Sequence, residues 1–463
     1  MADAPTTAGT PVQAAERLDR LPASRWLTGV MAILFLGWLV ESYDIGLTGS
    51  VLPSLTSVYN LGTGMESLTS ISASAGIVIG IVPAGWLADR LGRKRVMIGG
   101  TIAYSVLTLL TGFAPNIAIV ITLRVLSGLA MGAVFPLPYA YGSELCPPGI
   151  RGRFTGIADT FLSIGYFISP LLALALIPSD TDTTGWRIMF FIGAAPIIFA
   201  ILAWKFVPES PRWSEAKGRL EDAERTLRDI EARVESEHGK PLPPPPPAET
   251  AEGTAGPAAS TSVRDIFSRA YLARSIMLWI TFGGLFFVFY SIQVFMPTVV
   301  SKMGFTLTSA FAFTSIIVLI SIPGKLLEAW LVERWGRRPV IISFGVVAAV
   351  AAIVFGFSRG AAMVLVIGCV MSFFGIGVDP AVKVYTAESY PTSIRATGTS
   401  LTEGIGRLLS GVIGPSLVPL LLVAVGVSGV YLVIGVVALI AVATVIVFGH
   451  ETKGKPLEAI ATD

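Results

Sequence analysis

Twelve long apolar runs dominate the sequence and constrain its fold more than any other feature. The hydrocarbon core of a bilayer is about 30 Å thick, and a helix needs about 20 apolar residues to cross it. The runs have this length, and they lack the period-2 alternation of a membrane barrel. We therefore predict an all-α membrane protein with twelve transmembrane helices. The predicted cores are 27–53, 67–88, 96–113, 116–138, 154–177, 187–207, 273–297, 308–332, 339–357, 361–386, 399–422 and 429–449.

The composition excludes a soluble enzyme. Charged residues make up 14% of the 463 residues, against about 25% in an ordinary soluble domain. A soluble chain of this length has to cover its core with charge, and this chain lacks the residues to do so. The net charge of +2 indicates no nucleic-acid partner. The cysteines, Cys146 and Cys369, are too few for a disulfide framework.

Basic residues concentrate in the loops of one side. The opposite side carries only Arg187, Lys302 and Arg359. The positive-inside rule then places both termini and the long central loop in the cytoplasm of a multi-pass plasma-membrane protein. The residues of the basic side are Arg17, Arg20, Arg25, Arg90, Arg93, Lys94, Arg95, Arg151, Arg153, Arg334, Arg337, Arg338, Arg395, Lys453 and Lys455.

The central loop divides the chain into two halves. It begins with a charged stretch, 214–235, for which we expect one or two surface helices, and continues into the proline run 243–247. A proline-rich linker has no core around which to fold. The predicted organisation is a tail over 1–26, a six-helix half over 27–207, the loop over 208–270, a second half over 271–449 and a tail over 450–463.

An internal repeat relates the halves at a single offset of 244 residues. The motif at Asp89 recurs at Glu333, and Arg93 recurs as Arg337. One offset that holds through three motifs indicates duplicated six-helix units, with a substrate cavity between them near the middle of the membrane. The other equivalent pairs are Glu144 and Glu388, Pro147 and Pro391, Arg151 and Arg395, and Asp159 and Glu403.

These motifs resemble those of the major facilitator superfamily. The loop GWLADRLGRKR (85–95) is similar to its signature between the second and third helices, and AWLVERWGRRP (329–339) is similar to the second copy. PESPRW (208–213) and ETKGKPLE (451–458) resemble the branch that holds sugar porters and metabolite:proton symporters. YTAESYPTSIRATG (385–398) looks most like the symporters that include nicotinate and aromatic-acid carriers. The resemblance implies a secondary transporter, monomeric, with no cofactor.

Two carboxylates in the first apolar run are candidates for carrying protons. Glu41 and Asp44 stand three residues apart, which places both on one helix face. Ionisable groups inside membrane helices are costly and mark functional hypotheses. Arg124, in the fourth run, is the expected partner of Asp44, because the resemblance implies such a pair in related symporters. The alternative is a purely structural ion pair.

Arg407 is the candidate anion ligand. The stretch GRLLSG (406–411) resembles the segment that contains an arginine in aromatic-acid and organic-anion carriers. A guanidinium group can bind a carboxylate through two parallel hydrogen bonds. The alternative is an internal ion pair with Glu403, four residues earlier. Lys383 and Asp379 are expected to pair with each other or to contact substrate, and Lys325 and Glu328 to form a local pair. The further candidate substrate contacts are Tyr290, Gln293, Asp159 and Glu403.

The motifs at the helix ends are expected to form a gate rather than to bind substrate. The resemblance implies salt bridges there that hold one side of the transporter closed, and such networks can be exchanged as the halves rock. The expected gate residues are Asp89, Arg93, Glu144, Arg151, Glu209, Arg212, Glu333, Arg337, Glu388, Arg395 and Glu451.

Two absences narrow the function. The sequence has no GxxxxGK[ST] motif, so ATP hydrolysis is not the expected energy source. His238 and His450 lie outside the apolar runs, so no metal site or histidine relay is expected in the membrane. We predict alternating-access symport of a small organic anion, aromatic or other carboxylate, with protons. The alternatives are a sugar or polyol:proton symporter, a drug or organic-cation exporter, and a non-transporting membrane sensor.

Overall fold

The computed structural model describes residues 12–178, 183–244, 266–268, 271–390 and 394–453, and every regular element in them is a helix. Eleven helical stretches of these residues are long and apolar enough to cross a bilayer. The last stretch, Thr397–Phe448, covers 52 residues and turns at Gly426, where the backbone leaves helical geometry. It therefore makes two crossings, and the predicted twelve-helix architecture is confirmed.

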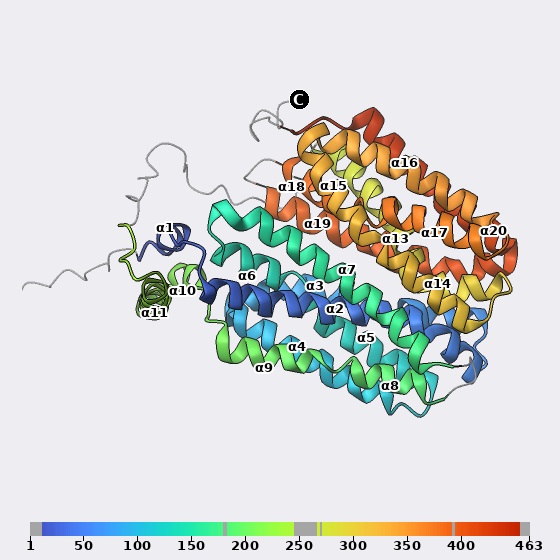
Figure 1. The fold of residues 1–463 in the computed structure, drawn as a ribbon, viewed down its shortest axis with the longest axis horizontal. Coiled ribbons are helices and arrows are strands. Elements are labelled where there is room, and N and C mark those ends of the chain that lie inside the picture. The colour runs from blue at the N-terminus through green and yellow to red at the C-terminus, as the bar shows by residue number, and fades with distance from the viewer. Residues whose placement is uncertain (1–11, 179–182, 245–265, 269–270, 391–393, 454–463) are drawn as a thin grey trace, which may run out of the picture.

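The first half packs six crossings into one bundle, the N-half (Figure 1). Within it α3 lies along α5, and α2 lies along α7. Its α5 is continued by the short α6, and α8 and α9 together make the last crossing. The helices are α2 (Arg25–Val58), α3 (Thr63–Leu91), α4 (Arg93–Gly112), α5 (Ile117–Val134), α6 (Leu137–Leu145), α7 (Pro148–Leu176), α8 (Gly185–Ile192) and α9 (Pro196–Phe206).

The second bundle, the C-half, repeats this arrangement (Figure 1). Its α14 and α15 form one crossing, and so do α17 and α18. A π-helical turn, η1, separates α19 from α20, and α20 packs on both α13 and α16. The helices are α13 (Leu272–Lys302), α14 (Leu307–Leu319), α15 (Ser321–Trp335), α16 (Arg337–Gly356), α17 (Ala361–Gly375), α18 (Asp379–Glu388), α19 (Arg395–Arg407), η1 (Leu408–Ile413) and α20 (Gly414–Phe448).

The halves meet mainly through α2 with α13, α7 with α14, and α3 with α20, and also through α3 with η1 and α7 with α15. The closest approach is at Gly49 of α2. A Cβ atom there would lie 2.1 Å from the carbonyl oxygen of Gln293 in α13 and 2.7 Å from the Cα of Val294. Only glycine permits this backbone contact, which joins the halves in the part of α2 beyond Asp44.

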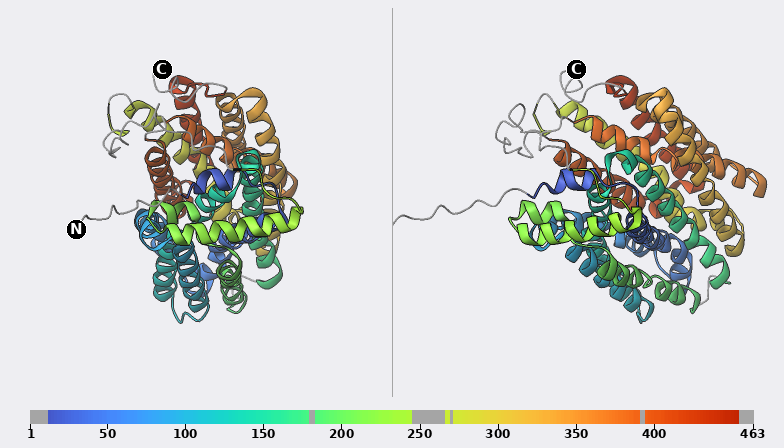
Figure 2. Two further views of the ribbon diagram at one scale, coloured as in Figure 1. Left: turned by 90° about the vertical axis from the view of Figure 1, so that its left-hand side faces the viewer. Right: turned by 60° about the vertical axis from the view of Figure 1, so that its left-hand side comes forward.

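Three short helices cover one end of the N-half, called here the α11 end (Figure 2). They are α1 (Ala14–Asp19), α10 (Pro211–Ala216) and α11 (Leu220–His238). The charged stretch was predicted to form surface helices, and α10 and α11 confirm this. One face of α11 is apolar and buried through Ala223, Leu227, Ile230 and Val234. The end of the proline run, from residue 245, lies outside the described residues.

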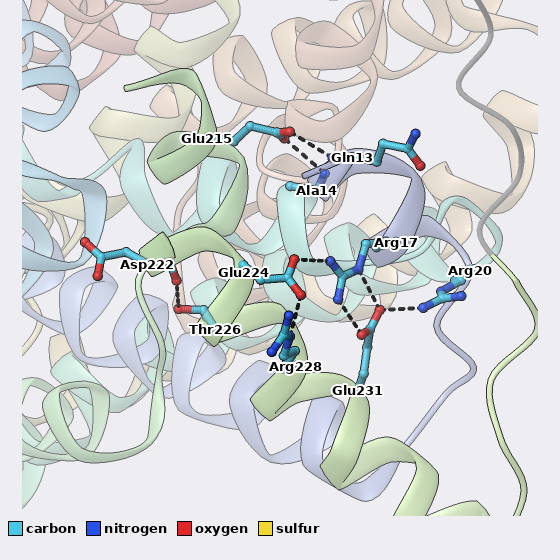
Figure 3. Close-up of polar contacts among 10 residues, drawn as sticks. All are labelled: Gln13, Ala14, Arg17, Arg20, Glu215, Asp222, Glu224, Thr226, Arg228 and Glu231. Atoms are coloured by element: carbon cyan, nitrogen blue, oxygen red, sulfur yellow. Dashed lines mark hydrogen bonds and ion pairs between the residues drawn. The ribbon is translucent and has the colours of Figure 1, made fainter. Parts of the chain in front are cut away.

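Carboxylates of α10 and α11 fix the N-terminal helix to this end (Figure 3). Arg17 of α1 donates to Glu224 over 2.5 Å and to both oxygens of Glu231 over 2.9 and 2.6 Å. Arg20 donates to Glu231 over 2.5 Å. Glu215 accepts from the backbone N–H groups of Gln13 and Ala14, which satisfies donors left open at the start of α1. The tail therefore docks through these charges together with the buried apolar side chains of Ala14 and Leu18.

This docking depends on pH. Burial opposes ionisation of Glu231, but the hydrogen bonds from Arg17 and Arg20 outweigh it and lower the pKa of Glu231. The hydrogen bond to Glu231 raises the pKa of Arg17. A carboxylate whose pKa is lowered in the folded state contributes stability above its unfolded pKa, about 4.3. That contribution is lost as the pH falls through the lower, folded value.

We expect Arg17→Gln to release α1 from α11, because it removes the hydrogen bonds of one guanidinium to two carboxylates. Hydrogen bonds to charged groups are worth about 1.5–3 kcal/mol, so protection of the α1 amides in hydrogen exchange should fall at least tenfold. The matched control is Arg225→Gln, since the Arg225 side chain is 72% exposed in its pair with Asp222. Equal exchange of α1 in the two variants would contradict this account of the docking.

Candidate functional site

Asp44 and Arg124 form a fully buried ion pair inside the N-half. Nη1 of Arg124 in α5 donates to Oδ1 and Oδ2 of Asp44 in α2 over 2.9 and 3.0 Å. Nη2 donates to the hydroxyl of Thr48 over 2.9 Å and to the carbonyl of Asp44 over 3.3 Å. Both side chains are 2% exposed. The geometry satisfies the carboxylate completely, so a change in its protonation would alter how α2 and α5 are joined.

Glu41 lies one turn from Asp44 along α2 and has a different environment. It is 2% exposed, and its Oε1 has no hydrogen-bond partner among the described residues. The charged groups within electrostatic range are Asp44 on its own helix and Arg407 of the C-half. The two candidate proton carriers are therefore near each other, but only Glu41 faces the other half.

Arg407 sits at the end of α19 and touches both halves. Its Nε and Nη2 donate to Oε1 of Glu403 over 3.2 and 2.8 Å, so the internal ion pair, given above as the alternative to anion binding, is present. Its guanidinium also lies 4.1 Å above the ring of Phe135, at the end of α5 in the N-half. Nη1 has no acceptor among the described residues, so one edge of the guanidinium is left for another anion. The π-helical turn η1 follows directly, and such turns frequently occur at functional sites.

Aromatic rings line the contact of α13 with α7 and η1. Tyr290 is 3% exposed, and its ring lies 2.9 Å from where a Cβ on Gly411 would be. Phe289 meets Tyr290 edge to face at 5.2 Å and meets Tyr166 of the N-half at 5.3 Å. Gln293 is 4% exposed, and its Nε2 has no partner in the described part of the chain. This wall offers flat apolar surface with few polar groups.

A second group of charges joins α7, α15 and α18. Lys383 lies 3.0 Å from Asp379 on the same helix, as expected, and 3.8 Å from Asp159 in the other half. Lys325 lies 3.5 Å from Asp379. The expected local pair of Lys325 with Glu328 is wrong, because Lys325 turns to the neighbouring helix. Glu328 is left buried, with neither carboxyl oxygen hydrogen-bonded within the described residues.

A cavity of about 600 Å³ separates the halves on the side of Asp89 and Arg93. Its wall is formed mainly by α3, the end of α5 and α19, and it includes Phe135, Glu403 and Leu408. Phe135 and Glu403 are also the two contacts of Arg407, whose own side chain is buried and does not line the cavity. The candidate anion ligand therefore lies behind two side chains of the cavity wall.

The duplicated motifs build the same structure at the ends of α4 and α16. Arg93 pairs with Glu144, which also accepts from Ser210 over 2.6 Å. Arg337 pairs with Glu388 over 3.0 Å, and Glu388 accepts from Thr452 over 2.6 Å. Each pair therefore joins helix ends within one half.

A further glutamate caps each of these helices. Glu209 accepts from the backbone N–H of Lys94 over 3.0 Å, and Glu451 accepts from those of Arg337 and Arg338 over 3.0 and 3.1 Å. A carboxylate at a helix N-terminus satisfies open donors and complements the helix dipole. Gly92 and Gly336, which precede the helices, have φ of 103° and 102°, values that favour glycine.

The remaining expected gate residues surround these two structures. Arg212 pairs with Asp19 at 2.7 Å, and Glu333 pairs with Arg337 at 3.4 Å. Asp89 is exposed, and its carbonyl accepts from the indole of Trp213. Arg395 donates to the carbonyl of Tyr390. The side chain of Arg151 lies outside the described residues.

Sequence reasoning missed three contributors to the site. Phe135 and Tyr166 are single aromatic residues in apolar runs, and nothing in their spacing distinguishes them from ordinary core residues. Thr48 was missed for a similar reason, although its position four residues after Asp44 on one helix face was a usable signal.

Comparison with known proteins shows that the chain is similar to membrane carriers. The family described as sugar (and other) transporter matches residues 30–463. The niacin transporter NiaP of Acinetobacter baylyi is 31% identical over 446 residues, which cover 96% of this chain and 98% of NiaP. The gallate transporter of Pseudomonas putida is 26% identical, over 95% of this chain and 96% of its own.

A solved structure shares the fold. It is the xylose transporter XylE from E. coli in an inward open conformation, which aligns with a TM-score of 0.74 over 94% of this chain and 99% of XylE. The two sequences are 21% identical.

We expect Arg337→Ala to destabilise the C-half, because it leaves the partly buried Glu388 with Thr452 as its remaining partner. Loss of a charged pair of this kind costs about 1–3 kcal/mol. The midpoint of thermal unfolding of the purified protein should fall by several degrees. Arg334→Ala is the matched control, since that guanidinium lies on the ring of Trp330 at an exposed position. An equal midpoint for the two variants would refute the bracing role.

Proposed function

The chain belongs to the sugar (and other) transporter family of the major facilitator superfamily, and from this premise we propose that it carries a small organic anion together with protons. It is a multi-pass membrane transporter and not an enzyme. The proposed cargo is an aromatic or other carboxylate, moved by alternating access. The observation that carries this proposal is the position of Arg407 directly behind Phe135 and Glu403, two residues that line the cavity between the halves.

Arg407 combines the features needed to bind an aromatic carboxylate. Its guanidinium is held by Glu403 and Phe135, so its orientation is fixed before substrate arrives. A fixed planar fork binds a carboxylate through two parallel hydrogen bonds. The aromatic wall of Tyr290 and Phe289 is suited to the ring of such a substrate. The carriers of niacin and gallate, both aromatic acids, are relatives that support this class.

The proposed proton carriers are Asp44 and Glu41, with Arg124 as the partner that favours ionised Asp44. An arginine does not release its proton at physiological pH, so any proton exchanged at this pair is exchanged by the carboxylate. Protonation of Asp44 would weaken its pair with Arg124 and loosen α2 from α5. Among the described residues of the membrane-spanning helices there is no histidine, which leaves the carboxylates to do this chemistry.

Alternating access is supported by the cavities between the halves. One of about 600 Å³ lies on the side of Asp89 and Arg93, another of about 590 Å³ lies beside Pro53 and Lys302, and the backbones of α2 and α13 touch at Gly49. We place the α11 end, with both termini, in the cytoplasm and treat the protein as a monomer. The ion pairs at the helix ends brace each half as a rigid body. They act as a gate if they exchange partners when the halves rock against each other.

A sugar or polyol is the second candidate substrate. The buried amide of Gln293 supports it, because its unpaired Nε2 is a donor suited to a hydroxyl oxygen. An aromatic wall with one amide is nevertheless sparse for a ligand covered in hydroxyl groups.

Removal of Arg407 should abolish binding of the anion. In proteoliposomes with wild-type protein, nicotinate uptake should exceed uptake of nicotinamide, which has the same ring without the carboxylate. Arg407→Ala should reduce nicotinate binding at least a hundredfold, and Arg407→Lys should restore it in part, since an ammonium lacks the planar fork. Normal nicotinate binding by Arg407→Ala, or uptake of xylose in preference to nicotinate, would contradict the organic-anion proposal and favour a sugar or polyol as the substrate.

Replacement of Asp44 should separate exchange from accumulation. Asp44→Asn mimics the protonated carboxyl, so substrate exchange across the vesicle membrane should persist while accumulation driven by a pH gradient disappears. Both are measured in one vesicle preparation, with Glu221→Gln, on the exposed face of α11, as the control. If Asp44→Asn still accumulates nicotinate against its gradient, Asp44 is not the proton carrier.

A further inference from the structure

Glu328 of α15 is a buried carboxyl group for which the transport mechanism above has no use. Its residue is 1% exposed, and neither oxygen has a hydrogen-bond partner in the described residues. The backbone N–H of Ala381, in the first turn of α18, is directed toward it without reaching hydrogen-bond geometry. An ionised carboxylate that is buried away from water and has no partner has a high free energy. Protonation removes the charge and so removes this penalty.

The charged groups that face Glu328 come from three of the helices around it. Lys325 is on α15 itself, Asp379 is on α18, and Asp159 is on α7; Lys383 of α18 joins the group through its pairs with the two aspartates. The other helices packed on α15 are α14, α16 and α17. Of these, α14 and α17 contain no acidic or basic residue. In the first turn of α16, the guanidinium of Arg337 donates to Glu388 and that of Arg338 donates to the carbonyl groups of Val445 and Ile446.

Three carboxylates, Asp159, Asp379 and Glu328, lie in this cluster with two ammonium groups, Lys325 and Lys383. Among the described residues, Glu328 is the member of the three for which the structure gives neither an ion pair nor a hydrogen bond. Asp379 has both ammonium groups at 3.0 and 3.5 Å, and Asp159 has Lys383 at 3.8 Å.

We propose that Glu328 is a second proton-binding site, located in the C-half, and that it is protonated in the conformation described here. The proton resides on the carboxyl group that lacks an ion pair, and the two aspartates stay ionised beside the lysines. When Glu328 ionises, the proton leaves as H⁺ to water. The carboxylate then forms an ion pair with the ammonium group of Lys325, three residues away on the same helix.

Movement of the two halves controls this site through Lys383. Its contact with Asp159 joins α18 to α7 across the gap. Separation of the halves at this point leaves Lys383 with Asp379 alone, which frees Lys325 to turn toward Glu328 and favours release of the proton. The use of this step to drive substrate rests on the proposed function, but the protonation itself does not.

The protonation is tested without substrate. The infrared carbonyl stretch of a protonated carboxyl group is recorded for purified protein in lipid from about pH 5 to about pH 9. At neutral pH we expect a band in the wild type that is reduced in Glu328→Gln, because buried Glu41 can also contribute, and that is kept in Asp44→Asn and in the exposed control Glu221→Gln. Because glutamine is nearly isosteric with a protonated glutamate, the variant should fold. An unchanged band in Glu328→Gln would overturn the proposal.

The coupling to movement is tested with spin labels at equivalent positions of the two halves. Arg90→Cys and Arg334→Cys, in protein with Cys146 and Cys369 replaced by alanine, place exposed labels 244 residues apart in the repeat. We expect the distance between the labels to change with pH, and Glu328→Gln to remove at least half of that change. A pH response identical in Glu328→Gln and in its parent would overturn the coupling. Neither measurement uses nicotinate, so a failure of nicotinate uptake would refute only the proposed function.

Discussion

The cost of keeping a charge away from water organises the interior of this protein. Every ionised group in a low-dielectric region has to find an opposite charge with good geometry, or it gives up its charge. Three groups meet this condition: Asp44 with Arg124, Arg407 with Glu403, and Asp379 with two lysines. The first of these groups joins α2 to α5, and the last joins α15 to α18, so a change in protonation there becomes a change in packing.

The duplicated halves share their ion pairs at the helix ends but differ in the charged residues of their interiors. At the ends of α4 and α16 the equivalent pairs Arg93–Glu144 and Arg337–Glu388 keep the same geometry. The interiors have diverged, because the N-half holds an isolated Asp–Arg pair and the C-half holds a branched cluster that reaches Asp159. Shared bracing with different interiors suits two rigid bodies that rock about a site built from both.

The sequence predicted the elements well because their causes are local. Apolar runs of membrane-spanning length predict the crossings, and pairs four residues apart on one helix, such as Arg407 with Glu403, follow from helix geometry. Lys325 shows where local reasoning fails. Its spacing to Glu328 suggests a pair, but Asp379 on α18 offers the better partner. A contact between helices depends on rotation and depth, which no local pattern encodes.

The fold class, the internal repeat and the residues able to carry charge in the membrane can be inferred from the sequence, since length, hydropathy and a constant offset are properties of the chain. Which of these charges meet depends on the tertiary packing. It placed Phe135 under Arg407, brought Lys383 to Asp159 across the halves and left Glu328 without a partner among the described residues. The reason is physical: helices far apart in the chain become neighbours only after packing, and the dielectric environment of each side chain is set by those neighbours.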